Sequence, residues 1–349
     1  MAGVPEYIKG KKLGLAERVC FQPAGPSKMR HPEVREIGDP YAMRFQIRAI
    51  YGLAFRSGLR WSTIVGVATH HPCVCDHRKS FARLSKDAGT KTCIVFVHGF
   101  FGNARTTWQH FAELCDTGAT TGSALLDRSD LYFFDYPAQS GFVKASAHEL
   151  STFLGRVFPT PDMKLFFYED ACRAAIRNSW TPYTKVVLVG HSLGAVVIRE
   201  CVENQFRLPG ELTPANWVQA CEVRLFGAAH LGFQPSGWKD FVFEALPSAL
   251  TSFPKIWRAF NDLRQDSTTL RDLRNRTQLL ASSRPSATCF RAHLLYGTKE
   301  AVVIPGEFDC DYRIRWLEGL NHTQVCKPTQ NFREPIGFVG DERSTPANA

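Results

Sequence analysis

The chain of 349 residues is long enough for one large domain with insertions, or for two domains. Its hydrophobic fraction of 44% and charged fraction of 21% are ordinary for a globular protein in water. The sequence contains neither a bilayer-length apolar run nor a secretory signal, which argues against membrane-spanning and exported proteins and predicts a cytoplasmic location.

The net charge of +9 is concentrated in residues 1–90, which contain 15 Lys and Arg against 7 Asp and Glu. Arginines and aromatic residues alternate between positions 44 and 61, so this basic segment could contact an anionic membrane surface. The alternative interpretation is a solvated basic face on an element that packs against the core. No nucleic-acid-binding motif accompanies the charge, and no nucleic acid partner is expected.

Residues 1–90 are predicted to be a basic N-terminal extension that contributes early strands, with candidates at 43–53 and 62–68. The run HHPCVCDH at 70–77 contains six side chains that could bind a metal. Its Cys-x-Cys spacing lacks the longer return loop of a zinc site, so no metal is predicted and the run is interpreted as a polar loop.

A regular pattern begins at residue 91 and defines a predicted domain over 91–349. Short, continuous apolar runs, typical of strands covered on both faces, alternate with segments of helical length. The predicted strands are 91–97, 131–136, 185–189, 223–228 and 292–296. The predicted helices are 106–115, 143–158, 165–179 and 195–206. This alternation predicts an α/β fold with a mostly parallel central sheet and helices on both of its faces.

One long insertion, residues 233–288, interrupts the alternation. Its first part is rich in aromatic residues, and its second part spaces leucines as in an amphipathic helix. An insertion after the strand at 223–228 would lie over the carboxyl ends of the strands, where open α/β sheets bind ligands. We interpret it as a partial lid.

Ser192 lies in the pattern Gly190-His191-Ser192-Leu193-Gly194. The strand at 185–189 leads directly into this pattern, and a helix leaves it. A strand, a sharp turn and a helix around Gly-x-Ser-x-Gly are typical of the nucleophile turn of α/β-hydrolases, which exposes a serine oxygen above the sheet. The helix N-terminus also directs free N–H groups and a positive dipole at the serine.

The loop HGFFGN, residues 98–103, follows the strand at 91–97. In this architecture, an N–H of that loop and the N–H after the nucleophile form the oxyanion hole. The predicted donors are therefore the main-chain N–H groups of Phe100 and Leu193. His98 is interpreted as a structural residue that braces the loop by hydrogen bonds.

The histidine base is predicted to be His322. The triad runs in the order serine, acid, histidine in this fold, and only His230, His293 and His322 follow Ser192. His230 and His293 have no acid segment ahead of them, whereas His322 follows all the predicted strands.

The acid of the triad is predicted to be Glu300, which lies in the loop after the strand at 292–296. Asp309 and Asp311 are the alternatives.

Residues 91–328 resemble the lipase-like serine-esterase branch of the α/β-hydrolases, which includes the serine-active-site-containing proteins. The matching segments are FVHGFFGN, LYFFDYPAQS, LVGHSLGAVVIRE, LFGAAHLGF, DSTTLRDLRNRTQLL and GLNHTQVCKP. The resemblance implies a Ser192–acid–His322 triad and an ester or lipid-like acyl substrate. Members of this branch usually have an acid directly after the strand, where this chain has Gly297, so Glu300 must reach from three residues further on.

The sequence therefore predicts a serine hydrolase of carboxylic esters that needs no metal or organic cofactor. Phe101, His191 and His230 are expected to contact the substrate. A thioesterase or an acyltransferase would use the same triad, and a catalytically silent, membrane-associated scaffold is a third alternative. The oligomeric state is left open.

Overall fold

A central sheet organises the part of the chain that the structure, a computed structural model, describes. This part comprises residues 70–75, 77–116, 121, 123–138, 142–167, 180–206, 215–234, 263–265 and 267–340. All of them belong to one unit, Leu59–Ala349. The predicted early strands at 43–53 and 62–68, and the basic aromatic segment between positions 44 and 61, lie outside the described residues.

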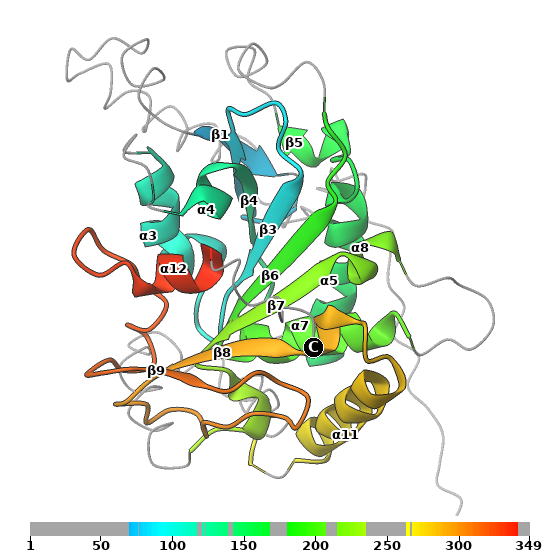
Figure 1. Cartoon of the computed structure of the whole chain (residues 1–349), viewed down its shortest axis with the longest axis vertical. Helices are drawn as coiled ribbons and strands as arrows, with labels where there is room; N and C mark the ends of the chain where they lie inside the picture. Colours follow the sequence, from blue (N-terminus) through cyan, green and yellow to red (C-terminus); the bar gives the residue numbers. More distant parts are fainter. Residues whose placement is uncertain are drawn as a thin grey trace, which may run out of the picture. The chain divides into compact units, whose positions relative to one another are not determined.

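The described strands form one nine-stranded sheet in the order β5-β1-β2-β4-β3-β6-β7-β8-β9 (Figure 1). Neighbouring strands are parallel from β4 to β9, whereas β5, β1 and β2 extend the sheet in antiparallel pairing beside β4. The five predicted strands are confirmed as β3, β4, β6, β7 and β8. The strands are β1 (His70–Cys75), β2 (Phe81–Ser85), β3 (Thr92–Val97), β4 (Ser129–Phe134), β5 (Phe166–Phe167), β6 (Lys185–His191), β7 (Cys221–Phe226), β8 (Ala292–Gly297) and β9 (Arg315–Leu317).

Helices connect the parallel strands, and three of the four predicted ones are confirmed as α3, α5 and α7. The amphipathic helix predicted within the insertion is α11, whose Leu270 and Leu273 are buried. The described helices are α3 (Ala104–Asp116), α4 (Ala124–Asp127), α5 (Val143–Val157), α7 (Leu193–Asn204), α8 (Asn216–Gln219), α11 (Thr268–Ser283) and α12 (Glu334–Gly340), with short 3-10 turns η1 (Met163–Leu165), η2 (Ala229–Leu231) and η4 (Thr288–Phe290).

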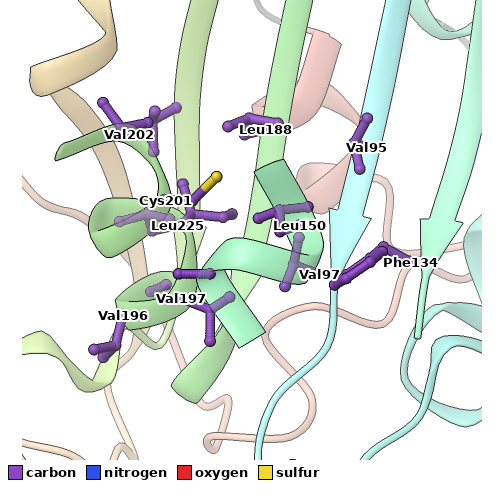
Figure 2. Packing of buried hydrophobic residues seen from close by; sticks show 14 of the residues in the cluster. Val95, Val97, Phe134, Leu150, Leu188, Val196, Val197, Cys201, Val202 and Leu225 are labelled. Carbon is purple, nitrogen blue, oxygen red and sulfur yellow. The ribbon is translucent and has the colours of Figure 1, made fainter. Parts of the chain in front are cut away.

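Both faces of the sheet are buried, because successive side chains of a strand point to opposite sides and helices pack on each side. In β3, Val95 and Val97 belong to one apolar cluster with residues of α5 and α7, and Figure 2 shows Val97 close to Leu150 of α5. Ile94 and Phe96 of the same strand belong to a second cluster, with residues of α3 and α12. The continuous apolar runs in the sequence reflect this double coverage.

Two sequence-based expectations are wrong. The run at 70–77 is not a polar loop, because His70–Cys75 forms strand β1, in which Cys73 and Cys75 are buried. The helix predicted over 165–179 does not begin as a helix, because Phe166–Phe167 forms β5 and pairs with β1. Residues 168–179 lie outside the described part. Among the described residues, no group of three or more His, Cys, Asp or Glu side chains could hold a metal ion.

The strands β3, β6, β7 and β8 end at one edge of the sheet. The loops that follow them begin at His98, Ser192, Gly227 and Thr298, so the segments that carry the predicted site converge there.

Within the described part, no helix combines the length and the apolar character needed to span a membrane. Residues 235–262 of the insertion are not described, so its role as a lid stays a prediction.

Candidate active site

Ser192 lies between strand β6 and helix α7, with a φ of 54° and a ψ of −119°. This positive φ is strained for a residue with a side chain, as the sequence predicts for a sharp nucleophile turn. The flanking glycines make the turn possible. A Cβ at Gly194 would collide with the main-chain oxygen of Val97, and one at Gly190 would lie 2.9 Å from Cδ1 of Ile198. The turn is therefore closely packed between a neighbouring strand and its own helix.

Main-chain hydrogen bonds hold Ser192 in this strained conformation. Its N–H donates to the oxygen of Phe226 at 3.0 Å, and its carbonyl oxygen accepts from the N–H of Ala229 at 3.2 Å. The Oγ atom is buried and makes no hydrogen bond with any described residue. Because buried hydroxyls normally have a partner, this one needs a functional explanation.

The loop after β3 lies directly against Ser192. A Cβ at Gly99 would lie 2.8 Å from the Cβ of Ser192, so only a glycine allows this approach. The next two residues, Phe100 and Phe101, pack their rings edge to face at 4.3 Å, and Phe101 has a positive φ of 58°. Leu193 begins α7, where the first N–H groups have no partner within the helix. The two segments predicted to supply oxyanion donors therefore meet at Ser192.

His98 braces this loop, as the sequence predicts. Its Nδ1 donates to the carbonyl oxygen of Gly99 at 2.9 Å, and its Nε2 accepts from the N–H of Tyr136 at 3.3 Å. The hydroxyl of Tyr136 donates to the carbonyl oxygen of His98 at 2.8 Å. Burial lowers the pKa of His98, which favours the neutral ring that these bonds require. Sequence reasoning gave Tyr136 no role, although it is the last residue of the strand predicted at 131–136.

Glu300 and His322 form a buried pair. Nδ1 of His322 donates to Oε2 of Glu300 at 2.8 Å, and the two side chains are only 2% and 1% exposed. The other oxygen of Glu300 accepts from the N–H groups of Val302 at 2.9 Å and Val303 at 3.1 Å. Burial alone would raise the pKa of Glu300, but the bond and charge of His322 and these two N–H groups lower it overall. An ionised carboxylate therefore faces one nitrogen of the imidazole.

The two alternative acids contact arginines. Asp309 is 83% exposed and lies 3.8 Å from Arg274. The side chain of Asp311 is fully buried and accepts a 2.6 Å hydrogen bond from Arg199. The structure thus pairs Glu300 with His322 and pairs each alternative acid with an arginine.

His191 and His230 hold main-chain segments in place. Nε2 of His191 donates to the carbonyl oxygen of His322 at 2.9 Å, and the two rings are 4.8 Å apart. Nε2 of His230 donates to the carbonyl oxygen of Gly306 at 2.9 Å. Burial is the largest of the effects that lower the pKa of each imidazole to about 3, so both are neutral near pH 7. Contacts of His191, His230 and Phe101 with a substrate stay predictions.

Gly227 is a further residue of this site that sequence reasoning missed. It follows β7 with a φ of +48°, and a Cβ there would lie 3.0 Å from Nδ1 of His322 and 3.4 Å from Oε2 of Glu300. The absence of a side chain therefore leaves room for the pair. The available signal was a glycine near the end of the strand predicted at 223–228.

Replacing Gly227 with Ala is expected to lower kcat of the ester hydrolysis predicted from the sequence by about 10- to 100-fold, because a small displacement of His322 is costly. The added methyl group would push against the ring atoms that contact Glu300. Steady-state kinetics with a chromogenic ester would measure the effect.

The matched control is Gly319→Ala. Gly319 has a φ of +76°, but a Cβ there would meet no atom within 4 Å. Both variants strain the backbone, whereas only Gly227→Ala crowds the histidine. An equal loss of kcat in both variants would contradict the crowding explanation.

The sequence profile of the Alpha/beta hydrolase family matches residues 94–322, which include the Ser192 turn, Glu300 and His322. The chain belongs to the alpha/beta hydrolase family. This match and the sheet topology confirm the predicted family and fold class, while the narrower resemblance to the serine-active-site-containing branch stays a prediction. A search of curated protein sequences finds no match for this hydrolase.

Three solved structures that match this alpha/beta hydrolase share little sequence identity with it. Esterase B from Lactobacillus rhamnosis is 12% identical, with 86% of this chain and 93% of that chain covered and a TM-score of 0.44. The peroxisomal alpha-beta-hydrolase Lpx1 from Saccharomyces cerevisiae is 12% identical, with 74% and 78% covered and a TM-score of 0.42. Carboxylesterase CesB from Bacillus subtilis is 10% identical, with 77% and 90% covered and a TM-score of 0.39.

Proposed function

We propose that this hydrolase cleaves carboxylic esters of a small molecule or a lipid through an acyl-enzyme intermediate on Ser192. The observation that carries the proposal is the 2.8 Å hydrogen bond between Nδ1 of His322 and Glu300, at the sheet edge where Ser192 lies. A carboxylate that accepts from Nδ1 leaves Nε2 as the nitrogen that can accept a proton. The ring of His191, the residue before the nucleophile, lies 4.8 Å from the ring of His322.

In the proposed reaction, His322 removes the proton of Ser192 while Oγ attacks the ester carbonyl. The N–H groups of Phe100 and Leu193 bind the oxyanion that develops on the carbonyl oxygen. The protonated imidazole then donates its proton to the leaving alcohol, and Glu300 stabilises its positive charge. Water, activated by the same histidine, attacks the acyl-enzyme and releases the carboxylic acid and free Ser192.

Phe101 is the residue that we propose contacts the acyl or alcohol group. Its ring is partly exposed and packs against Phe100, one of the two proposed oxyanion donors. An aromatic ring at this position favours an apolar substituent. No step of the mechanism requires a metal or an organic cofactor, and contact of the basic N-terminal segment with a membrane stays a prediction.

A fluorophosphonate probe tests the proposal, because it reacts with activated serines and mimics the tetrahedral intermediate. We expect the folded protein to take up one probe per chain, and tandem mass spectrometry to locate it on Ser192. Turnover of p-nitrophenyl esters from butyrate to palmitate would then define the acyl preference. A folded protein that takes up no probe, or that takes it up on another serine, would refute the proposal.

Two further measurements separate ester hydrolysis from its closest alternatives. A matched acyl-thioester assayed beside the ester would reveal a thioesterase by a higher kcat/KM for the thioester. An added alcohol would reveal an acyltransferase if the ester product accumulates faster than the free acid. We expect hydrolysis of the oxygen ester to dominate in both comparisons.

A further inference from the structure

A buried ion pair joins the helix that begins at the nucleophile to the segment that carries the other two members of the proposed triad. Arg199 lies in α7, about two helical turns after Ser192. Its Nη2 donates to Oδ2 of Asp311 at 2.6 Å, and the two side chains are 3% and 0% exposed. Asp311 lies midway along the chain between Glu300 and His322.

Asp311 fixes its own segment by two more hydrogen bonds. Its Oδ1 accepts from the N–H of Ala292, the first residue of β8, at 2.9 Å. Its Oδ2 also accepts from the N–H of Phe308 at 2.9 Å. One carboxylate therefore connects α7, the start of β8 and the loop that runs from Glu300 to His322.

The ring of Phe308 adds a second connection. The guanidinium carbon of Arg199 lies 4.3 Å from the centre of this ring, and the imidazole of His230 lies 4.6 Å from it. His230 belongs to η2, and the N–H of its neighbour Ala229 donates to the carbonyl oxygen of Ser192. The three segments that follow β6, β7 and β8 thus meet at one aromatic ring.

Stability alone does not account for this pair. Removing two charges from water costs more than their attraction returns in many buried pairs, and apolar replacements of similar volume are often as stable. Nε of Arg199 is also buried and makes no hydrogen bond with any described residue, so the guanidinium is not fully satisfied. The pair does fix the position of α7 relative to the loop from Glu300 to His322, because a planar guanidinium forms hydrogen bonds through its edge and stacks through its face.

We propose that Arg199 is a positioning residue that acts through Asp311 and Phe308 to set the distance between Ser192 and the Glu300–His322 pair. It touches neither substrate nor reacting atoms. This inference rests on the proposed function, since it assigns Arg199 a part in aligning that triad.

The double variant Arg199→Met/Asp311→Asn tests the proposal without leaving an unpaired buried charge. Met fills a volume similar to that of Arg, and Asn can still accept from the N–H of Ala292. We expect a folded protein whose kcat is about 10- to 100-fold lower than that of the wild type, with KM changed by less than about twofold, because misalignment affects the chemical step. The rate of fluorophosphonate labelling should fall in parallel.

The matched control is Arg276→Met. Arg276 in α11 donates to Glu203 at 2.7 Å and to Glu200 at 3.1 Å, so it is a second ion-pair partner of α7. It reaches the helix from a segment that carries no member of the proposed triad. We expect this variant to melt at a lower temperature and to keep kcat within about twofold of the wild type, because only Arg199 aligns the reacting groups.

Wild-type kcat in the folded double variant would overturn the positioning role, and so would an equal loss of kcat in Arg276→Met. If the double variant does not fold, Arg199→Lys decides, because it keeps the charge beside Asp311 but removes the planar face from Phe308. We expect a kcat about tenfold lower in Arg199→Lys, and an unchanged kcat would overturn the proposal. If the wild type takes up no fluorophosphonate, the proposed function itself is overturned. If the wild type is labelled but the variants keep wild-type kcat, only the positioning role of Arg199 is overturned.

Discussion

Ser192→Ala is expected to lower kcat for ester hydrolysis by on the order of 10⁶-fold, which is what removal of the nucleophile from a Ser-His-acid site typically costs. Alanine has no oxygen to form the acyl-enzyme. The oxyanion donors and substrate binding would remain, so a residual acceleration of roughly 10³- to 10⁴-fold over water should persist. Initial rates with a p-nitrophenyl ester and fluorophosphonate labelling would both measure the loss.

The fold should tolerate this change. Oγ of Ser192 makes no hydrogen bond with the described residues, so its removal breaks no such contact. The melting temperature of Ser192→Ala should therefore match that of the wild type. Ser146→Ala is the control, because Ser146 is a buried serine of α5 that belongs to none of the segments of the candidate site, and its removal should leave turnover unchanged. Substantial turnover by a folded Ser192→Ala variant would point to another nucleophile.

Glu300→Gln is expected to lower kcat by about 10³- to 10⁴-fold. The amide keeps the size of the side chain but removes its charge, so the imidazolium of His322 loses its stabilising partner. The amide nitrogen also cannot accept from Nδ1, and if it faces the ring it favours the tautomer whose Nε2 already carries a proton. Steady-state kcat at saturating ester, with folding checked by circular dichroism, would measure the effect.

Asp309→Asn provides the matched control for charge removal in the same segment. Because Asp309 is 83% exposed and 3.8 Å from Arg274, its replacement should change kcat by less than about twofold. Asp311→Asn should have an intermediate effect, since that carboxylate contacts Arg199. A larger loss in either aspartate variant than in Glu300→Gln would show that the acid is misassigned.

The parallel part of the fold could be predicted from the sequence because it is buried on both faces. Runs such as Lys91–Val97 and 185–189 are continuously apolar and β-branched, which leaves little choice of structure. The antiparallel edge could not be predicted in this way. In β1, histidines and cysteines do not form an apolar run, and β5 is two residues long and pairs with β1 across about ninety intervening residues. Such pairing depends on contacts that a local pattern does not contain.

The candidate site also contains residues that the sequence could predict and residues that it could not. Ser192 and the HGFFGN loop have fixed positions relative to a strand end, so a linear motif could locate them. The choice of Glu300 over Asp309 and Asp311 depends on the path of a loop: the N–H of Lys299 donates to the oxygen of Leu320 at 2.9 Å, which brings the turn after β8 beside the segment that carries His322. The roles of Gly227 and Arg199 depend on contacts between segments far apart in the sequence, and no sequence motif predicts these contacts.

The antiparallel pair β1 and β2 has a practical consequence for work with shortened chains. The family match begins at residue 94, yet β2 hydrogen-bonds along β4, and the ring of Phe81 stacks on that of Phe133 at 4.4 Å. A recombinant fragment trimmed to the family boundary would leave one side of β4 with unpaired N–H and C=O groups. Unprotected edges of this kind recruit strands from other molecules, so such a fragment would tend to precipitate for reasons unrelated to its chemistry. Expression of this hydrolase should therefore begin upstream of His70.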